Sequence, residues 1–194
     1  NGLKPELGML VYEDISGHNG EPDGEINSWD RVILKDSNNP FVFGLNLGGS
    51  WKGLSIDAMF SGRLGYKRWA YDVCDGVEWN RMWTKWYYDS WTPENPNATL
   101  PKRVSANASN TYYMSTDYWL KDASHMRLKY LTLSYNLPKG LFLDKICENV
   151  RIFVTGTNLF VLSSFNKNYY DPEIGNGNSY PIMRSFNFGI DVKF

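Results

Sequence analysis

The chain closes on a stretch in which apolar and polar residues alternate without interruption, Arg184-Ser185-Phe186-Asn187-Phe188-Gly189-Ile190-Asp191-Val192-Lys193-Phe194. A period of two is that of a β-strand, so one face would carry the apolar set Phe186, Phe188, Ile190, Val192 and Phe194. A free edge with so aromatic a face would promote aggregation unless it were covered. Closure of the sheet into a barrel would pair this free edge with another strand. A soluble β-sandwich could also contain such a strand, so the strand alone is compatible with both architectures.

The amino-acid composition argues against some classes of protein and is compatible with others. The 194 residues suffice for one domain with a sizeable core. Twenty basic and 21 acidic residues give a net charge of −1, which lacks the basic surplus of a nucleic-acid-binding surface. Aromatic residues reach 16%, which fits the interface girdles of a membrane barrel and equally a surface that stacks on sugar rings. No apolar run approaches the roughly 20 residues of a membrane-spanning helix.

Further alternating segments precede the closing one. A β-hairpin is predicted at residues 40–64, where Phe41, Phe43, Leu45 and Leu47 alternate with small or polar residues before a tight reversal at 51–53. A third strand is predicted within 118–137 and a fourth from about Asn149 to Leu162, and 118–162 thus forms two strands joined by a turn. The closing strand occupies 184–194.

The connections between these strands alternate in length. They are short at 51–53 and 138–147 and long at 66–116 and 163–183. Outer-membrane barrels have short periplasmic turns and long external loops, so the loop rhythm and the strand alternation predict the same topology. Residues 1–38 would form a further external loop region. Cys74 and Cys147 would lie at opposite ends of a strand about 30 Å long, so we expect no disulfide between them.

Five strands make an open sheet, and lipid tolerates no open sheet edge, because unpaired backbone groups would be buried there. The expected fold class is therefore all-β: the C-terminal strands of a large antiparallel transmembrane β-barrel, with long external loops and a short helix in one of them. The first residues read as if they continued from a longer chain.

One loop has the spacing of a calcium site. If Gly24 is the sixth position of a calcium loop, the oxygen ligands are Asn19, Glu21, Asp23, the Glu25 carbonyl and Asp30. The loop departs from the usual pattern, because Asn opens it and Asp replaces the usual final Glu. A solvated turn that reverses at Asp23-Gly24 explains the same residues and is the simpler interpretation. No cofactor is otherwise required.

Aromatic residues concentrate in the two longest loops. Trp79, Trp83 and Trp86 recur at helical spacing, which predicts a helix around 77–90 ended by Pro93. These residues, with Tyr169 and Tyr170 of the second loop, are candidate contacts for a substrate or a covering partner. The alternative is that the stripe packs the loop onto its own neighbours.

Nothing in the sequence favours an enzyme. Ser124 and His125 are adjacent and would point to opposite faces of a strand, and neither His18 nor His125 has a nucleophile at a meaningful spacing. We therefore predict that the chain has no catalytic residues.

Several runs resemble the SusC/RagA family of TonB-dependent outer-membrane transporters of the Bacteroidetes. They are WLKDASHMRLKYLTLSYNLP at 119–138, RIFVTGTNLF at 151–160, DPE at 171–173 followed by YP at 180–181, and GIDVKF at 189–194, with weaker matches at 91–98 and 40–51. Together they cover most of the chain in the family's order. In two places the sequence departs from the family, at His125-Met126 and in an expanded acidic loop where Asp14 matches the family's first acidic position better than Asn19.

The resemblance implies a barrel of 22 strands with an N-terminal plug, in the outer membrane of a Gram-negative bacterium. It implies import of oligosaccharides or peptides, energy from the TonB complex, a SusD-like surface lipoprotein as lid, and insertion by the barrel assembly machinery. The plug and the first strands are not among these residues. The apolar set of the closing strand would be the assembly signal. The alternative is a soluble, aromatic-rich β-sandwich that binds carbohydrate.

Overall fold

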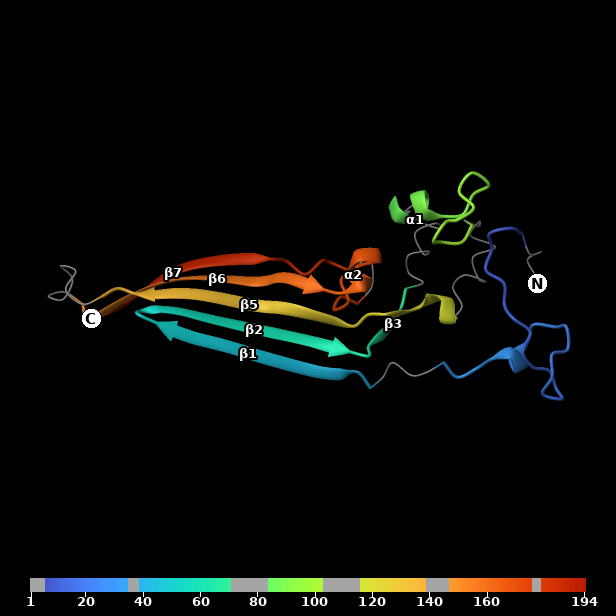
Figure 1. The fold of residues 1–194 in the computed structure, drawn as a ribbon, viewed down its shortest axis with the longest axis horizontal. Coiled ribbons are helices and arrows are strands. Elements are labelled where there is room, and N and C mark those ends of the chain that lie inside the picture. Colours follow the sequence, from blue (N-terminus) through green and yellow to red (C-terminus); the bar gives the residue numbers. More distant parts are fainter. Residues whose placement is uncertain (1–5, 35–38, 71–83, 103–115, 139–146, 176–178) are drawn as a thin grey trace. The chain divides into compact units, whose positions relative to one another are not determined.

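The computed structural model describes residues 6–34, 39–70, 84–102, 116–138, 147–175 and 179–194 (Figure 1). These residues group into two compact units, one of Asn1–Asp36 with Trp69–Lys121 and the other of Ser37–Arg68 with Asp122–Phe194. The second unit contains the main sheet.

The second unit is built on five long antiparallel strands. They are β1 (Phe41–Trp51), β2 (Leu54–Leu64), β5 (His125–Asn136), β6 (Asn149–Leu162) and β7 (Ser185–Lys193). Their order in the sheet is β1-β2-β5-β6-β7, so each long strand pairs with the next one along the chain, as Figure 1 shows. The prediction of an all-β, antiparallel fold is confirmed.

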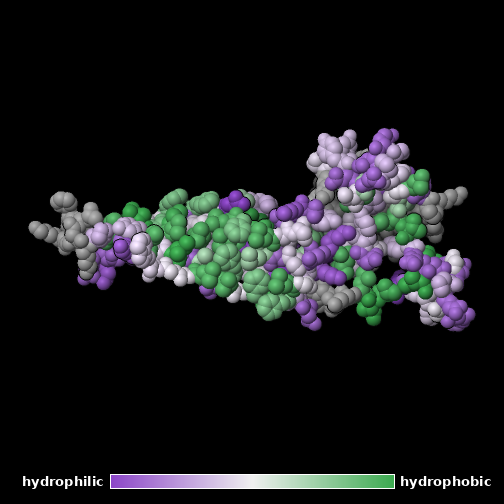
Figure 2. Space-filling model, viewed as in Figure 1, coloured by the Kyte–Doolittle hydropathy of each residue, from purple (hydrophilic) through white to green (hydrophobic). Residues whose placement is uncertain are grey.

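The strand registers put most of the large apolar residues of the five strands on one side of the sheet. One row across the sheet runs Gly49, Ile56, Leu133, Val154 and Phe188, each residue paired with the next. Ile56, Leu133 and Phe188 are 47%, 40% and 81% exposed, so nothing in the described part of the chain covers this side. Figure 2, on the side that it draws, shows hydrophobic surface gathered over the strands. We call this side the apolar face; its main residues are Phe43, Leu45, Leu47, Leu54, Ile56, Phe60, Leu131, Leu133, Tyr135, Val150, Ile152, Val154, Phe186, Phe188, Ile190 and Val192.

The opposite side, the polar face, carries the intervening residues. The row adjacent to that of Ile56 and Leu133 runs Gly48, Asp57, Thr132, Thr155 and Asn187. The hydroxyls of Thr132 and Thr155 are hydrogen-bonded at 2.8 Å. The sheet is therefore two-sided, and hydroxyl pairs such as this one link neighbouring strands on its polar side.

The hairpin between β1 and β2 turns on two residues in the left-handed region. Lys52 has φ 46° and Gly53 has φ 86°. Positive φ at both central residues matches the turn whose twist suits a two-residue hairpin. A side chain at Gly53 would place its Cβ 2.9 Å from the Asn136 carbonyl oxygen of β5, so this position requires glycine for space as well as for φ.

The strand expected over 118–137 differs in the structure, because it is divided. A 3₁₀ turn, η5 (Asp117–Trp119), leads into the short strand β4 (Leu120–Asp122), which forms a two-stranded sheet with β3 (Lys67–Trp69). The Asp122 carboxylate then accepts hydrogen bonds from the Ser124 backbone N–H at 2.9 Å and hydroxyl at 2.6 Å. This local turn redirects the chain before β5 begins.

A β-bulge also interrupts β5. The pairing with β2 shifts between Phe60–Leu128 and Met59–Tyr130, which leaves Lys129 as the extra residue. The pairing of β5 with β6 shifts at the same place, where Asn158 has φ 52°. Bulges turn side chains away from the regular pleat. The bulge thus allows Lys129 to reach Glu173 on the polar side of the sheet.

The first unit consists of loops with the short turns η1 (Ser28–Asp30) and η5 and the helix α1 (Thr84–Asp89). α1 lies within the range 77–90 in which the sequence predicts a helix, and residues 77–83 fall outside the described ranges. Trp119, Ala70 and Leu100 are buried in this unit. The remaining helix, α2 (Ser164–Asn168), follows β6 in the second unit. Within the described ranges no helix is both long and apolar enough to cross a membrane.

Candidate functional site

A cluster of charged side chains lies at the β5 end that is remote from the hairpin turn. His125, Arg127 and Lys129 project from β5 toward Asp171 and Glu173, which follow α2 in the loop before β7. His125 and Arg127 share a face because strand side chains alternate, and Lys129 joins them as the residue of the bulge. We call these five residues the loop clasp, because they attach the 163–184 loop to the sheet.

Arg127 is the centre of the clasp. Its side chain is 3% exposed, and its Nη2 lies 2.5 Å from both carboxylate oxygens of Asp171, while its Nε lies 2.6 Å from Glu173 Oε2. Lys129 Nζ donates to the same Glu173 oxygen at 2.8 Å. A buried guanidinium is tolerated only when carboxylates compensate it, and here two do so. The Asp171-Pro172-Glu173 motif thus closes around one arginine.

Glu173 is held in its charged form. The neighbouring His125 ring, together with Lys129 and Arg127, lowers the pKa of Glu173 to about 2 from 4.5, against the opposing effect of burial. His125 Nε2 lies 3.4 Å from Glu173 Oε1, and its Nδ1 lies 2.9 Å from the Ala123 carbonyl oxygen. Since Ser124 bonds to Asp122 instead, Ser124 and His125 do not form a nucleophile–base pair.

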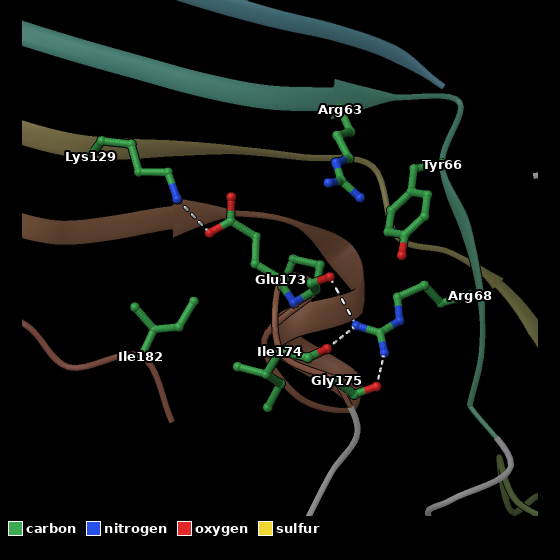
Figure 3. Close-up of a pocket in the computed structure, with 9 residues that line it drawn as sticks. Arg63, Tyr66, Arg68, Lys129, Glu173, Ile174, Gly175 and Ile182 are labelled. Carbon is green, nitrogen blue, oxygen red and sulfur yellow. Dashed lines mark hydrogen bonds and ion pairs between the residues drawn. The ribbon is translucent and has the colours of Figure 1, made fainter. Parts of the chain in front are cut away.

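Arg68 holds the same loop through its main chain. Its guanidinium donates to the carbonyl oxygen of Pro172 at 2.9 Å and to those of Ile174 and Gly175 (Figure 3). It also lies 5.3 Å from the centroid of the Tyr170 ring. Three carbonyls in one fork fix the chain direction after Glu173, which the carboxylate contacts alone would not do.

An open pocket of about 510 Å³ lies beside the clasp. Figure 3 shows Arg63 and Tyr66 above it, Arg68 on one side, and Lys129 with Glu173 on the other. Arg63 lies with its guanidinium carbon 5.2 Å from the centroid of the Tyr66 ring. The lining is polar and mainly cationic, and all of it belongs to the second unit.

The aromatic residues proposed as ligand contacts have different positions. Tyr170 is 8% exposed and meets Phe165 edge-on at 5.0 Å between ring centroids, and Tyr169 lies 5.0 Å from the same ring. These contacts pack the loop around Phe165, and contact of Tyr169 and Tyr170 with a substrate or lid stays a prediction. Trp79 and Trp83 fall outside the described residues, and of Trp86 only the position in α1 is described.

The acidic loop predicted to bind calcium uses its carboxylates on its own backbone. Asp30 accepts from the N–H groups of Asn27 at 2.7 Å and Ile15 at 2.9 Å, and these bonds lower its pKa. Asp14 accepts from the Gly24 N–H at 2.5 Å.

The other predicted ligands are not gathered into one site. Asp23 accepts from the Glu25 N–H at 3.0 Å, and Asn19 and Glu21 are exposed. In the part of the chain that the structure describes, no three His, Cys, Asp or Glu side chains come together as a metal site would require. Calcium binding by this loop stays a prediction.

The apolar set of the closing strand lies as the alternation predicts. Phe186, Phe188, Ile190 and Val192 are on the apolar face of β7, Phe194 follows the strand, and all five are exposed. Their role as an assembly signal stays a prediction. Cys74 lies outside the described residues, so the absence of a disulfide with Cys147 also stays a prediction.

The sequence did not identify Arg63, Arg68, Arg127 or Lys129 as site residues. A signal was present, since Arg127 and Lys129 stand two apart in a strand and two acids flank Pro172. Pairing them requires knowledge of contacts between residues 44 and 46 positions apart in the chain, which local patterns do not supply.

Comparison with known proteins gives relatives along almost the whole chain. The TonB-dependent receptor P26 of Formosa agariphila is 30% identical over 97% of this chain, and the TonB-dependent receptor SusC of Bacteroides thetaiotaomicron is 25% identical over 96%. A solved structure of the RagAB peptide transporter matches 93% of the chain with a TM-score of 0.68 and 26% identity. No protein-family model matches the chain.

The chain spans about a fifth of the length of these relatives, 20% of P26 and 19% of SusC. They are receptors and a transporter by name, which agrees with the prediction that the chain is not an enzyme. The resemblance in the sequence motifs and the arrangement of the strands therefore point to the same group of proteins.

Proposed function

Because the chain belongs to the SusC/RagA family of TonB-dependent transporters, we propose that it forms part of the wall of a nutrient importer in the outer membrane of a Gram-negative bacterium. In this arrangement the apolar face meets lipid and the polar face lines the lumen. The edge strands β1 and β7 pair with further strands of the same barrel.

The apolar face carries this proposal. It crosses all five strands and many of its large apolar side chains are exposed, a pattern that a soluble sheet avoids by packing that face on a core. The five strands have nine to 14 residues each, which corresponds to about 30 Å or more, enough to cross the hydrocarbon layer of a membrane. The polar face, with its hydroxyl pairs, suits a water-filled interior.

The cargo and the partners follow from the relatives. One solved neighbour is described as a peptide importer, and the sequence resemblance implies oligosaccharides or peptides as cargo. We propose a SusD-like surface lipoprotein as lid, the TonB complex as energy source, and release when the plug is displaced. The loop clasp would hold one external loop in a fixed position on the wall.

The test uses bacteria that make the intact protein with an affinity tag. We expect the protein in the outer-membrane fraction, a surface lipoprotein that copurifies with it, and a growth defect of the deletion strain on some member of a panel of oligosaccharides and peptides. A strain without TonB should show the same defect. Recovery of the intact protein in a soluble fraction would instead support the carbohydrate-binding sandwich and overturn the proposal.

A further inference from the structure

The side chains that line the pocket beside the loop clasp carry more positive than negative charge. Its lining includes three cations, Arg63, Arg68 and Lys129, and one acid, Glu173. Glu173 already forms ion pairs with Lys129 and with the buried Arg127, so its negative charge is not available to balance Arg63 or Arg68. Arg68 donates to carbonyl oxygens, which satisfy its N–H groups and leave its charge without a carboxylate.

Arg63 is the cation best placed to receive a ligand. In the described part of the chain Arg63 has no ion pair. Its guanidinium carbon lies over the Tyr66 ring, 5.2 Å from the ring centroid. Figure 3 shows its guanidinium extending from β2 into the space between Tyr66 and Glu173. A guanidinium stacked on an aromatic ring keeps the N–H groups of its edge directed outward, where they can bind a carboxylate with two parallel hydrogen bonds.

The surroundings of Arg63 are already ordered. Arg68 is fixed by three carbonyls and Lys129 by Glu173, so neither needs to rearrange to contribute its field. Arg63 is paired with His125 in the sheet register, and it lies on the polar face at the end where the 163–184 loop attaches. A cavity of about 510 Å³ has room for one acidic sugar or one amino-acid unit.

We propose that this pocket binds a carboxylate group of the cargo, with Arg63 as the residue that contacts it and Arg68 and Lys129 as the source of the surrounding positive potential. The proposal rests on the import function only in naming the ligand as cargo. Its consequence is a preference of the transporter for acidic over neutral forms of the same small molecule.

The binding test uses the purified intact transporter in detergent and isothermal titration with two matched pairs of probes. Glucuronate is compared with glucose, and acetylglycine with acetylglycinamide, so each pair differs at the carboxylate. We expect at least one acid to bind at least tenfold more tightly than its neutral partner, with an affinity that falls as salt is raised. The pair that shows the difference identifies the sugar or the peptide chemistry as the source of the carboxylate.

Three variants locate the binding. Arg63→Gln should remove the preference for the acid, and Arg63→Lys should keep part of it, because Lys retains the charge without the fork. Arg151→Gln is the matched control, since Arg151 is also on the polar face but pairs with Asp191 at the other end of the sheet. It should leave the preference unchanged. Migration of unheated samples in gel electrophoresis verifies that each variant is folded.

Equal binding of acids and neutral partners, dissociation constants of both acids above about 10 mM, or equal losses in Arg63→Gln and Arg151→Gln would each overturn the pocket proposal. These outcomes are separate from the import assay. A strain that imports its cargo through a transporter without acid preference contradicts the pocket alone. A transporter that binds acids through Arg63 and imports nothing contradicts the proposed function alone.

Discussion

At the scale of single residues, the 163–184 loop is held by two arginines with different chemistry. Arg127 uses ion pairs with Asp171 and Glu173, and Arg68 uses main-chain carbonyls of the next residues. The first set depends on charge and the second does not. Replacing one acid should therefore loosen the loop without releasing it completely.

We predict that Glu173→Gln weakens the attachment of this loop. The substitution keeps the side-chain volume but leaves Arg127, 2% exposed, with Asp171 as its remaining acid. Because Glu173 is partly exposed, we expect a cost of roughly 1–3 kcal/mol, below that of a fully buried pair. Hydrogen exchange of the amides at 164–175 in the intact transporter measures the effect. The control is Glu148→Gln, whose ion pair with Lys193 is exposed, and equal effects of the two changes would contradict the prediction.

The same prediction has a pH dependence with a defined sign. The folded-state pKa of Glu173, about 2, is below its usual value of 4.5, so its charge stabilises the clasp fully above pH 4.5. The stabilisation should be lost as the pH falls from 4.5 toward 2. Exchange protection of the loop should decline over this window in the unmodified protein, and Glu173→Gln should reduce the decline. An identical pH profile in both proteins would show that Glu173 is not the titrating group.

At the scale of elements, the strands can be predicted from the local alternation of apolar and polar residues, whereas the breaks and bulges within them cannot. A period of two is visible in any ten residues, and it predicts the antiparallel sheet and which residues share a face. The division of the strand at Asp122 depends on a side-chain bond to Ser124, and the bulge at Lys129 shows only when two neighbouring strands are aligned. The charged cluster was missed for the same reason, because its partners come from distant parts of the chain.

The β1–β2 hairpin provides a prediction at this scale. Lys52 adopts a positive φ that costs a lysine more than an asparagine, so Lys52→Asn should stabilise the folded transporter by about 0.5 kcal/mol. Gly53→Val should destabilise it by more than 1 kcal/mol, since φ is 86° and the added Cβ would meet the Asn136 carbonyl oxygen at 2.9 Å. Urea midpoints of the intact transporter in detergent provide the measurement. Effects of the same sign in both variants would contradict this account of the turn.

At the scale of the whole molecule, the sheet described here is a segment of a larger wall. Its two faces differ over most of the sheet, and β1 and β7 form its two edges. The sequence predicted this organisation because strand alternation and loop lengths are independent patterns that agree. In the proposed importer, the cargo depends on which side chains meet in the lumen, and this is determined by the complete barrel.

The orientation of the wall can be tested with one pair of neighbouring substitutions in β7. Phe188 is 81% exposed on the apolar face near the middle of the strand, and Asn187 is next to it on the polar face. If the apolar face meets lipid, Phe188→Arg places a charge in the hydrocarbon layer and should destabilise the barrel by about 2–4 kcal/mol. Asn187→Arg places the same charge toward water and should cost less than about 1 kcal/mol. The yield of folded protein in the outer membrane and the urea midpoint after purification report both effects. Strand propensities span only about 1 kcal/mol, so a difference of the expected size reports the surroundings of the charge, and equal losses would mean that lipid does not contact this face.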